Sequence, residues 1–285
     1  MKTRFFGAAT LAFAVSVALA PAAYADPDDD KLLIDGEELA TQVESPNADN
    51  PLGTLYSGWR YRTDETQALQ TDDFENPAFI FVEEAREAWD TVEGEAGKAC
   101  SSCHGDVEEG MKGVRAGMPK YNAEAGELWS LENYVNNCRT NRMKAEAWKW
   151  DKEPMNGVVA LIGLQSRGMP VDVDISGPAE EWFKRGEEIY YTRYGQLELS
   201  CANCHEQSNG LMIRADHLSQ GHTNGFPTYR LKNTKLNSIH GRFKGCIRDT
   251  RAHTFSPGSP ELRALELYVA WRGEGLVVET PSVRQ

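Results

Sequence analysis

Two copies of the pentad Cys-x-x-Cys-His constrain this chain more than any other feature. They are Cys100-Ser-Ser-Cys103-His104 and Cys201-Ala-Asn-Cys204-His205. This spacing is the attachment signal of c-type haem, in which two thiols bind the porphyrin and the adjacent histidine binds the iron. A zinc site or a redox-active dithiol is the alternative for a single pentad. Two pentads in matching surroundings favour two covalently attached haem c groups, with His104 and His205 as proximal ligands.

The regions around the two pentads resemble each other in order and spacing. A predicted amphipathic helix carries Trp89 in the first half and Tyr190 in the second, and each aromatic lies eleven positions before a pentad. Each half ends in another helical pattern, at 156–167 and 260–272. These matches predict a mainly α fold with two tandem cytochrome c-like domains, at 76–176 and 177–285, and an N-terminal extension at 26–75. Within that extension we expect a helix near Lys31–Val43 and packing against the first domain.

The first 25 residues have the pattern of a secretory signal. Lys2 and Arg4 precede an apolar run from Phe5 to Ala20, and Ala23-Tyr24-Ala25 is a small-x-small cleavage site. We therefore predict export to the periplasm with cleavage after Ala25, and an uncleaved membrane anchor is the alternative. No later segment is apolar enough for a membrane span.

The formal net charge of −13 argues against a nucleic-acid partner, because phosphate backbones attract basic surfaces. The same charge repels a small anionic substrate at long range. Any anion site must therefore come from a local basic cluster.

Two cysteines remain outside the pentads, Cys138 and Cys246. In an oxidising compartment they could form a disulfide with each other. They also lie at equivalent places in the two halves, which favours one distal iron ligand per haem. Met118 in the first half, and Met212 or a histidine in the second, are the alternative ligands; the histidines are His217, His222, His240 and His253.

Basic residues surround both single cysteines. Arg139, Arg142 and Lys144 follow Cys138, and four cations lie within ten residues around Cys246: Arg242, Lys244, Arg248 and Arg251. Nearby cations lower the pKa of a thiol, and guanidinium groups bind tetrahedral oxyanions well. Haem propionates or solvent could account for the first group. The second group exceeds what two propionates require, so we predict an anion site beside Cys246.

The chain resembles the SoxA family. The resemblance rests on both pentads and on motifs in the second half: Leu218-Ser219-Gln220-Gly221, Asn224-Gly225-Phe226-Pro227-Thr228-Tyr229-Arg230-Leu231, Ile239-His240-Gly241-Arg242-Phe243 and Leu265-Glu266-Leu267-Tyr268. It covers nearly the whole chain after the signal. It implies a dihaem cytochrome subunit of the periplasmic SoxAX complex, an L-cysteine S-thiosulfotransferase of bacterial thiosulfate oxidation.

The resemblance also implies roles for particular residues and partners. Both haems would have His/Cys ligation, from His104 with Cys138 and from His205 with Cys246. The second haem would be the active one, with Cys246 able to carry a persulfide sulfur and Arg242 binding substrate. The monohaem cytochrome SoxX would form a heterodimer with this chain, the carrier SoxYZ would accept the product on a cysteine, and a small cytochrome c would accept the electrons.

We therefore expect oxidative coupling of thiosulfate to a carrier cysteine, with Cys246, Arg242 and Lys244 in catalysis and with Arg248 helping to bind substrate. Three rival functions remain open at this stage. They are a dihaem electron-transfer cytochrome without a covalent sulfur intermediate, a dihaem peroxidase-like enzyme and a non-catalytic scaffold for SoxX.

Overall fold

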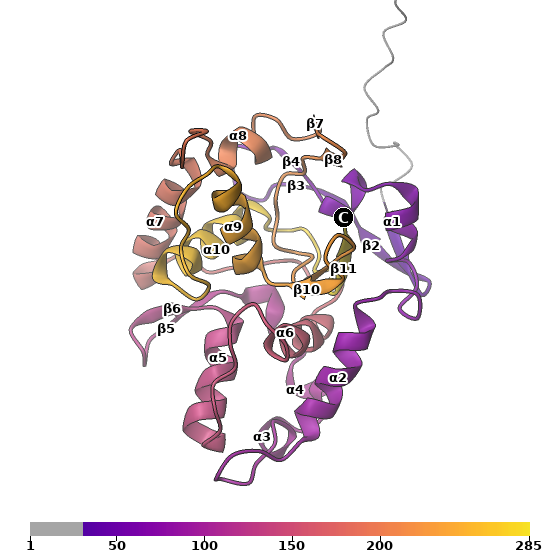
Figure 1. Cartoon of the computed structure of the whole chain (residues 1–285), viewed down its shortest axis with the longest axis vertical. Helices are drawn as coiled ribbons and strands as arrows, with labels where there is room; N and C mark the ends of the chain where they lie inside the picture. Colours follow the sequence, from indigo (N-terminus) through magenta and orange to yellow (C-terminus); the bar gives the residue numbers. More distant parts are fainter. Residues whose placement is uncertain (1–30) are drawn as a thin grey trace, which may run out of the picture.

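The computed structural model describes residues 31–285, and helices dominate its architecture (Figure 1). The predicted signal segment and its cleavage site lie outside the described residues. Among residues 31–285, no helix is both long and apolar enough to cross a membrane.

The extension begins with strands, so the helix expected near Lys31–Val43 is wrong. β1 (Lys31–Ile34) pairs antiparallel with β2 (Glu37–Ala40), and β3 (Gln42–Glu44) pairs with β4 (Thr54–Tyr56). Asp35 and Gly36 make the first turn with φ values of 50° and 87°. Leu32 and Ile34 are buried between exposed neighbours, which is the alternation of a strand. A tight Asp-Gly turn and a period of two therefore outweigh the helical propensity of this segment.

The extension packs mainly against the second half of the chain, and the expectation that it covers the first half is wrong. Leu52 and Leu55 share a small core with Leu276. The extension continues through η1 (Gly58–Tyr61) and α1 (Asp64–Ala68), both of which contact β11 (Ser282–Arg284) near the C-terminus. In Figure 1 this indigo and purple segment lies beside the orange and yellow end of the chain.

The two halves share the order of first helix, pentad helix, hairpin, helix with the single cysteine and last helix. Between pentad and hairpin, however, the first half has two short helices and the second half has two short strands. The first half contains α2 (Phe79–Asp90), α3 (Ser101–His104), α4 (Val107–Gly110), η2 (Arg115–Gly117), β5 (Lys120–Asn122), β6 (Glu127–Trp129), α5 (Leu131–Asn137), the π-helical turn η3 (Cys138–Met143) and α6 (Met155–Leu164). The second half contains η4 (Gly177–Ala179), α7 (Glu180–Tyr191), α8 (Cys201–His205), β7 (Met212–Ile213), β8 (Asp216–His217), β9 (Thr228–Arg230), β10 (Lys235–Asn237), α9 (Ile239–Asp249) and α10 (Pro260–Arg272). Both predicted aromatics, Trp89 and Tyr190, are buried near the ends of α2 and α7.

Each half inserts a hairpin into the core of the other. Leu128, in β6, is buried in the apolar core of the second half, and Leu236, in β10, is buried in that of the first. Arg263 in α10 donates to the carbonyl of Leu128 at 2.7 Å, and Asn156 in α6 donates to the carbonyl of Leu236 at 3.0 Å. The two cores are therefore continuous across the junction near residue 176.

The tightest helix crossing in the second half joins α7 to α10 at Gly186. A Cβ atom at this position would lie 2.1 Å from the carbonyl oxygen of Ala264 and 2.8 Å from the Cβ of Tyr268. Only a glycine fits there without moving one helix. The helix that leads to the second pentad thus packs backbone to backbone on the C-terminal helix.

We predict that Gly186→Ala lowers the free energy of unfolding by about 1–3 kcal/mol, because the added methyl group overpacks the crossing. Gly245→Ala is the matched control, since it is also a helical glycine but has no atom within 4 Å of the added Cβ. The control should be neutral or gain up to about 1 kcal/mol from helix propensity. Guanidinium unfolding of the haem-loaded protein measures both. Equal midpoints for the two variants would contradict the close crossing.

Candidate functional site

The second pentad forms the short helix α8, which starts at Cys201. Ser200 caps this helix: its hydroxyl accepts from the backbone N–H of Asn203 at 3.4 Å, and the Asn203 side chain accepts from the N–H of Ser200 at 2.8 Å. Residues three apart in a helix lie on one face, so Cys201 and Cys204 point the same way. His205 follows at the end of the same turn.

Each single cysteine lies beside its own pentad. The charge of Cys246 acts on Cys201 and Cys204, and His205 in turn acts on Cys246; the charge of Cys138 acts on Cys100, and Cys103 acts on Cys138. All six cysteines of the described chain are free, so the alternative of a disulfide between Cys138 and Cys246 is not observed. Figure 1 shows α3 and α8, which carry the two pentads, at opposite ends of the molecule.

The two single cysteines have opposite electrostatic environments. Burial raises the pKa of the Cys246 thiol, but the Arg242 guanidinium and the His205 ring outweigh it and bring this pKa to about 7. Burial raises the pKa of the Cys138 thiol as well, and Arg142 only partly opposes that effect. Cys246 is therefore much closer to a thiolate at neutral pH than Cys138 is.

Only one of the predicted cations on α9 acts on Cys246. Arg242 lies four residues before the cysteine and so shares its helix face, whereas Lys244 and Arg248 are exposed on other faces. Arg248 forms an ion pair with its neighbour Asp249 at 2.8 Å. Arg242 thus lies at the thiol, and the other two predicted residues lie at the surface around it.

Two arginines that the sequence analysis did not single out as site residues lie near Arg242. Burial lowers the pKa of Arg230, and the charge of Arg242 lowers it further. Burial, the charge of Arg284 and, to a smaller extent, that of Arg242 lower the pKa of Arg62 to about 10. Arg62 is buried, pairs with Asp216 at 3.4 Å and donates to the carbonyl of His217 at 2.8 Å. The sequence analysis already named Arg242, four residues before Cys246, but no local signal links Arg62, in the extension, to this site.

Unpaired polar atoms beside the second pentad suit a haem propionate. Arg272 is 1% exposed, and one of its terminal nitrogens, Nη2, has no hydrogen-bond partner among residues 31–285. The Tyr190 hydroxyl is likewise buried without a partner in that range, and the Arg272 guanidinium lies 4.4 Å from the Tyr190 ring centre. Arg272 Nη1 pairs with Glu206 at 3.1 Å, so Nη2 and the Tyr190 hydroxyl are the two buried groups that need an acceptor. Together with two thiols, an imidazole and an opposing thiol, they fit covalently bound haem.

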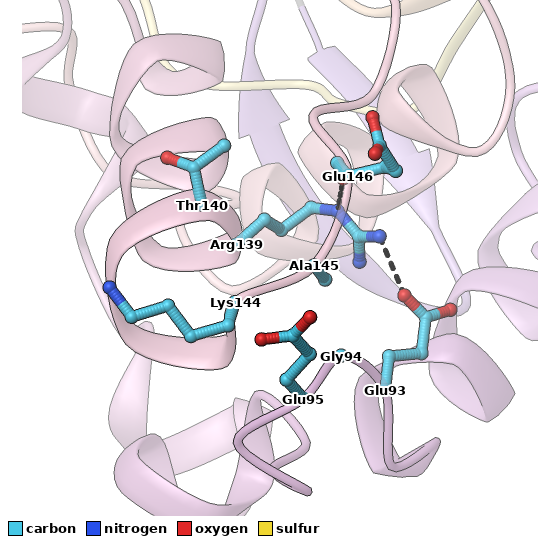
Figure 2. Close-up of a pocket in the computed structure, with 8 residues that line it drawn as sticks. All are labelled: Glu93, Gly94, Glu95, Arg139, Thr140, Lys144, Ala145 and Glu146. Atoms are coloured by element: carbon cyan, nitrogen blue, oxygen red, sulfur yellow. Dashed lines mark hydrogen bonds and ion pairs between the residues drawn. The ribbon is translucent and has the colours of Figure 1, made fainter.

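The first site differs because its arginine is already paired within the protein. Arg139 binds Glu93 at 2.6 Å, donates to the carbonyl of Glu146 at 2.9 Å and stacks 3.7 Å above the ring centre of Trp148. Figure 2 shows Arg139 reaching between the two glutamates in a pocket of about 820 Å³ that Lys144 also lines. This pocket leaves no unpaired guanidinium at Arg139 for an anion.

The alternative ligands lie in other environments. Met118 is buried in the apolar core of the first half, and Met212 is 54% exposed on β7. The His222 ring hydrogen-bonds to Gln220 at 2.9 Å, and burial lowers the pKa of His222 to about 3. The surroundings of Met118 and Met212 thus differ from those of the two single cysteines, whereas His222 lies near enough to His205 for the charge of His205 to lower its pKa as well.

A buried polar cluster holds α9 from behind. His240 accepts from the backbone N–H of Gly258 at 2.9 Å through Nδ1, so its Nε2 carries the proton that binds Glu266 at 3.1 Å. Glu132 from α5 and Arg115 from η2 complete this cluster, and all four charged or titratable side chains are nearly inaccessible. Residues from both halves therefore fix the helix that carries Arg242 and Cys246.

These features define a c-type cytochrome with a thiol-containing site, and comparisons with known proteins agree. The sequence profile of the SoxA/TsdA cytochrome c domain matches residues 84–171. This chain is 54% identical to the L-cysteine S-thiosulfotransferase subunit SoxA of Rhodovulum sulfidophilum, over 100% of both chains. It is 51% identical to the subunit of the same name from Paracoccus pantotrophus, over 99% of this chain and 98% of the relative. The crystal structure of SoxXA from P. pantotrophus superposes with a TM-score of 0.86 at 51% identity, over 91% of this chain and 100% of that one.

The chain belongs to the SoxA family of L-cysteine S-thiosulfotransferase subunits. The family and enzyme class predicted from the sequence are confirmed, and the cytochrome c domain implies covalently bound haem c.

The buried cluster behind α9 predicts a pH dependence of stability. Burial and the nearby charge of Glu266 raise the pKa of Glu132 to about 7, so the folded protein holds a proton there that the unfolded chain, with a pKa near 4.5, releases. This contribution to stability is complete below about pH 4.5 and is lost as the pH rises through 7.

We therefore expect Glu132→Gln, which keeps the shape but cannot ionise, to raise the unfolding temperature at pH 8 while changing it little at pH 5. Thermal unfolding at the two pH values measures this difference. Glu124→Gln, an exposed glutamate, is the control. An equal effect of Glu132→Gln at both pH values would show that Glu132 is ionised in the folded protein.

Proposed function

We propose that this chain is the catalytic dihaem subunit of a SoxAX complex, which oxidatively couples thiosulfate to the carrier cysteine of SoxYZ. SoxX is its heterodimeric partner, and two electrons pass to a small c-type cytochrome. One observation carries the proposal: of two equivalent cysteines, only Cys246 combines a lowered thiol pKa with an arginine on its own helix face. The high identity to SoxA subunits and the fold shared with SoxXA support the partner.

The proposal includes two haems in two tandem domains, at 76–176 and 177–285, with 26–75 as an extension. The repeated order of elements supports this division. A further repeat lies just before each pentad, where a single β-bridge joins Glu93 to Lys98 and Tyr194 to Leu199. His104 with Cys138, and His205 with Cys246, are the proposed axial pairs, and the four pentad cysteines are the attachment points.

The reaction needs a thiolate and an electron acceptor. We propose that the Cys246 thiolate attacks the sulfane sulfur of thiosulfate, so that a sulfur–sulfur bond forms and two electrons are released. When bound, haem supplies one-electron transfer for this oxidation. The carrier thiolate then attacks the same sulfane sulfur, which transfers the S–SO₃⁻ group to the carrier and restores the Cys246 thiolate. The net result is one new sulfur–sulfur bond and two electrons removed.

Arg242 is placed to hold the sulfonate end of thiosulfate, because it already stabilises negative charge at Cys246. Lys244 and Arg248 would attract the anion at the surface, against the net charge of the chain. Arg230, close to Arg242, adds a fourth cation to this set.

Location in the periplasm follows from the predicted signal segment, residues 1–25, and from the attachment of c-type haem outside the cytoplasm in bacteria. The mature protein would then begin at Asp26.

Intact mass spectrometry of the purified protein tests the cofactor assignment. We expect the mass of a chain that begins at Asp26 and carries two haem groups. A mass that corresponds to only one haem would contradict the dihaem assignment. Replacing Cys100 and Cys103 by alanine should remove one haem, and replacing Cys201 and Cys204 should remove the other.

Cys246→Met tests the covalent step. Methionine can still bind iron but cannot form a sulfur–sulfur bond, so we expect normal haem content with a loss of thiosulfate coupling of about 10³-fold or more. Thiosulfate-dependent reduction of haem, measured with SoxX and SoxYZ present, is the assay. A normal rate in this variant would favour the rival function, an electron-transfer cytochrome without a covalent sulfur intermediate.

A further inference from the structure

The Gln220 side chain joins the N-terminal extension to the loop that covers the second pentad. It is 4% exposed and comes from the loop that follows β8. Its oxygen accepts from the backbone N–H of Tyr56 at 2.8 Å, and its nitrogen donates to the carbonyl of Thr54 at 3.0 Å. The His222 ring contacts the same oxygen at 2.9 Å. The amide of Gln220 therefore pairs with β4 much as a neighbouring strand would.

The residues on either side of Gln220 contact the proximal ligand. The Ser219 carbonyl lies 2.7 Å from Nδ1 of His205, so it accepts the proton of that ring nitrogen. Gly221 packs against the same ring with φ +79°, and a Cβ there would lie 2.7 Å from Cγ of His205. The backbone from 219 to 221 therefore fixes both the hydrogen bond and the orientation of the imidazole.

The first site has no such arrangement, although the two halves repeat one another. Among residues 31–285 the His104 ring has no hydrogen-bond partner, and its recorded ring contact is with Trp89 at 5.8 Å between centroids. The residue equivalent to Gln220, 108 positions earlier, is Lys112. The extension contacts the second half, so only His205 lies next to a backbone segment that the extension holds.

We propose that Gln220 is a positioning residue for the second haem: it ties the extension to the Ser219 carbonyl and thereby sets the hydrogen bond and the basicity of His205. The inference rests on the proposed attachment of haem at the second pentad. A carbonyl that accepts the ring proton makes the imidazole a stronger donor to iron. A stronger donor favours Fe(III), and so this contact lowers the reduction potential of that haem.

The direct test is Gln220→Leu in the haem-loaded, full-length protein. Leucine fills the space but makes none of the three hydrogen bonds, so the Ser219 carbonyl is no longer held. We expect the potential of the second haem to rise, with the ratio of Fe(II) to Fe(III) at a fixed potential increasing on the order of tenfold, which is 59 mV for one electron. Spectroelectrochemical titration measures this, and the first haem serves as the internal reference.

Gln70→Leu is the matched control. Gln70 is also buried and also joins the extension to the second half, through Glu279 at 3.3 Å, the backbone N–H of Val283 at 3.0 Å and Arg284 at 2.7 Å. It has no contact with the loop at His205. Both variants should lose stability, but only Gln220→Leu should shift the second potential. Equal shifts in both, or no shift in either, would overturn the specific role of Gln220.

A second variant keeps the proposal testable if Gln220→Leu does not fold. Gly221→Ala retains the bonds of Gln220 to β4 but pushes a methyl group against the His205 ring. We expect a changed potential and a changed spectrum of the second haem only, and an unaltered second haem would overturn the inference. Haem content, measured by mass spectrometry, separates this inference from the proposed function. A wild-type protein without haem at the second pentad would refute the proposed function. Two haems with unshifted potentials in the variants would refute only the role of Gln220.

Discussion

The exchange of hairpins between the two halves is the constraint on which the rest of the structure depends. Leu128 and Leu236 each fill the core of the opposite half, and side chains of the terminal helices bind both of their carbonyls. Neither half can bury its apolar surface without the other. The two pentads lie at opposite ends of the molecule (Figure 1), and the helix that carries Cys246 is held by residues from both halves.

The same duplicated plan produces two chemically different cysteines. Around Cys138, Arg139 is paired with Glu93 and stacked on Trp148, and the charge of Arg142 only partly opposes the rise in the thiol pKa that burial causes. Around Cys246 the arginine shares the helix face of the thiol and stabilises its charged form. The charged surroundings of the two thiols therefore differ, although each thiol lies near an arginine.

The parts of the fold that were predictable from the sequence are those set by local patterns. The pentads, the helices with Trp89 and Tyr190, and the final helix at Pro260–Arg272 follow from fixed spacing and helical periodicity. The strands at Lys31–Ala40 contradict the predicted helix, because the turn at Asp35-Gly36 and the alternation of buried and exposed residues determine this segment. The positions of Arg62 and Gln220 near the second pentad depend on contacts between residues more than 150 positions apart. Such contacts cannot be predicted from a local sequence pattern.

The position of the extension has a consequence for the order in which the protein is made. Its β4 strand binds Gln220, and Gln70 binds Val283 at the far end of the chain. A chain that emerges N-terminus first therefore cannot complete these contacts until its last residues are available. Closing loops of this length is entropically costly and slow. The segment that is synthesised earliest is thus among the last whose contacts can be completed.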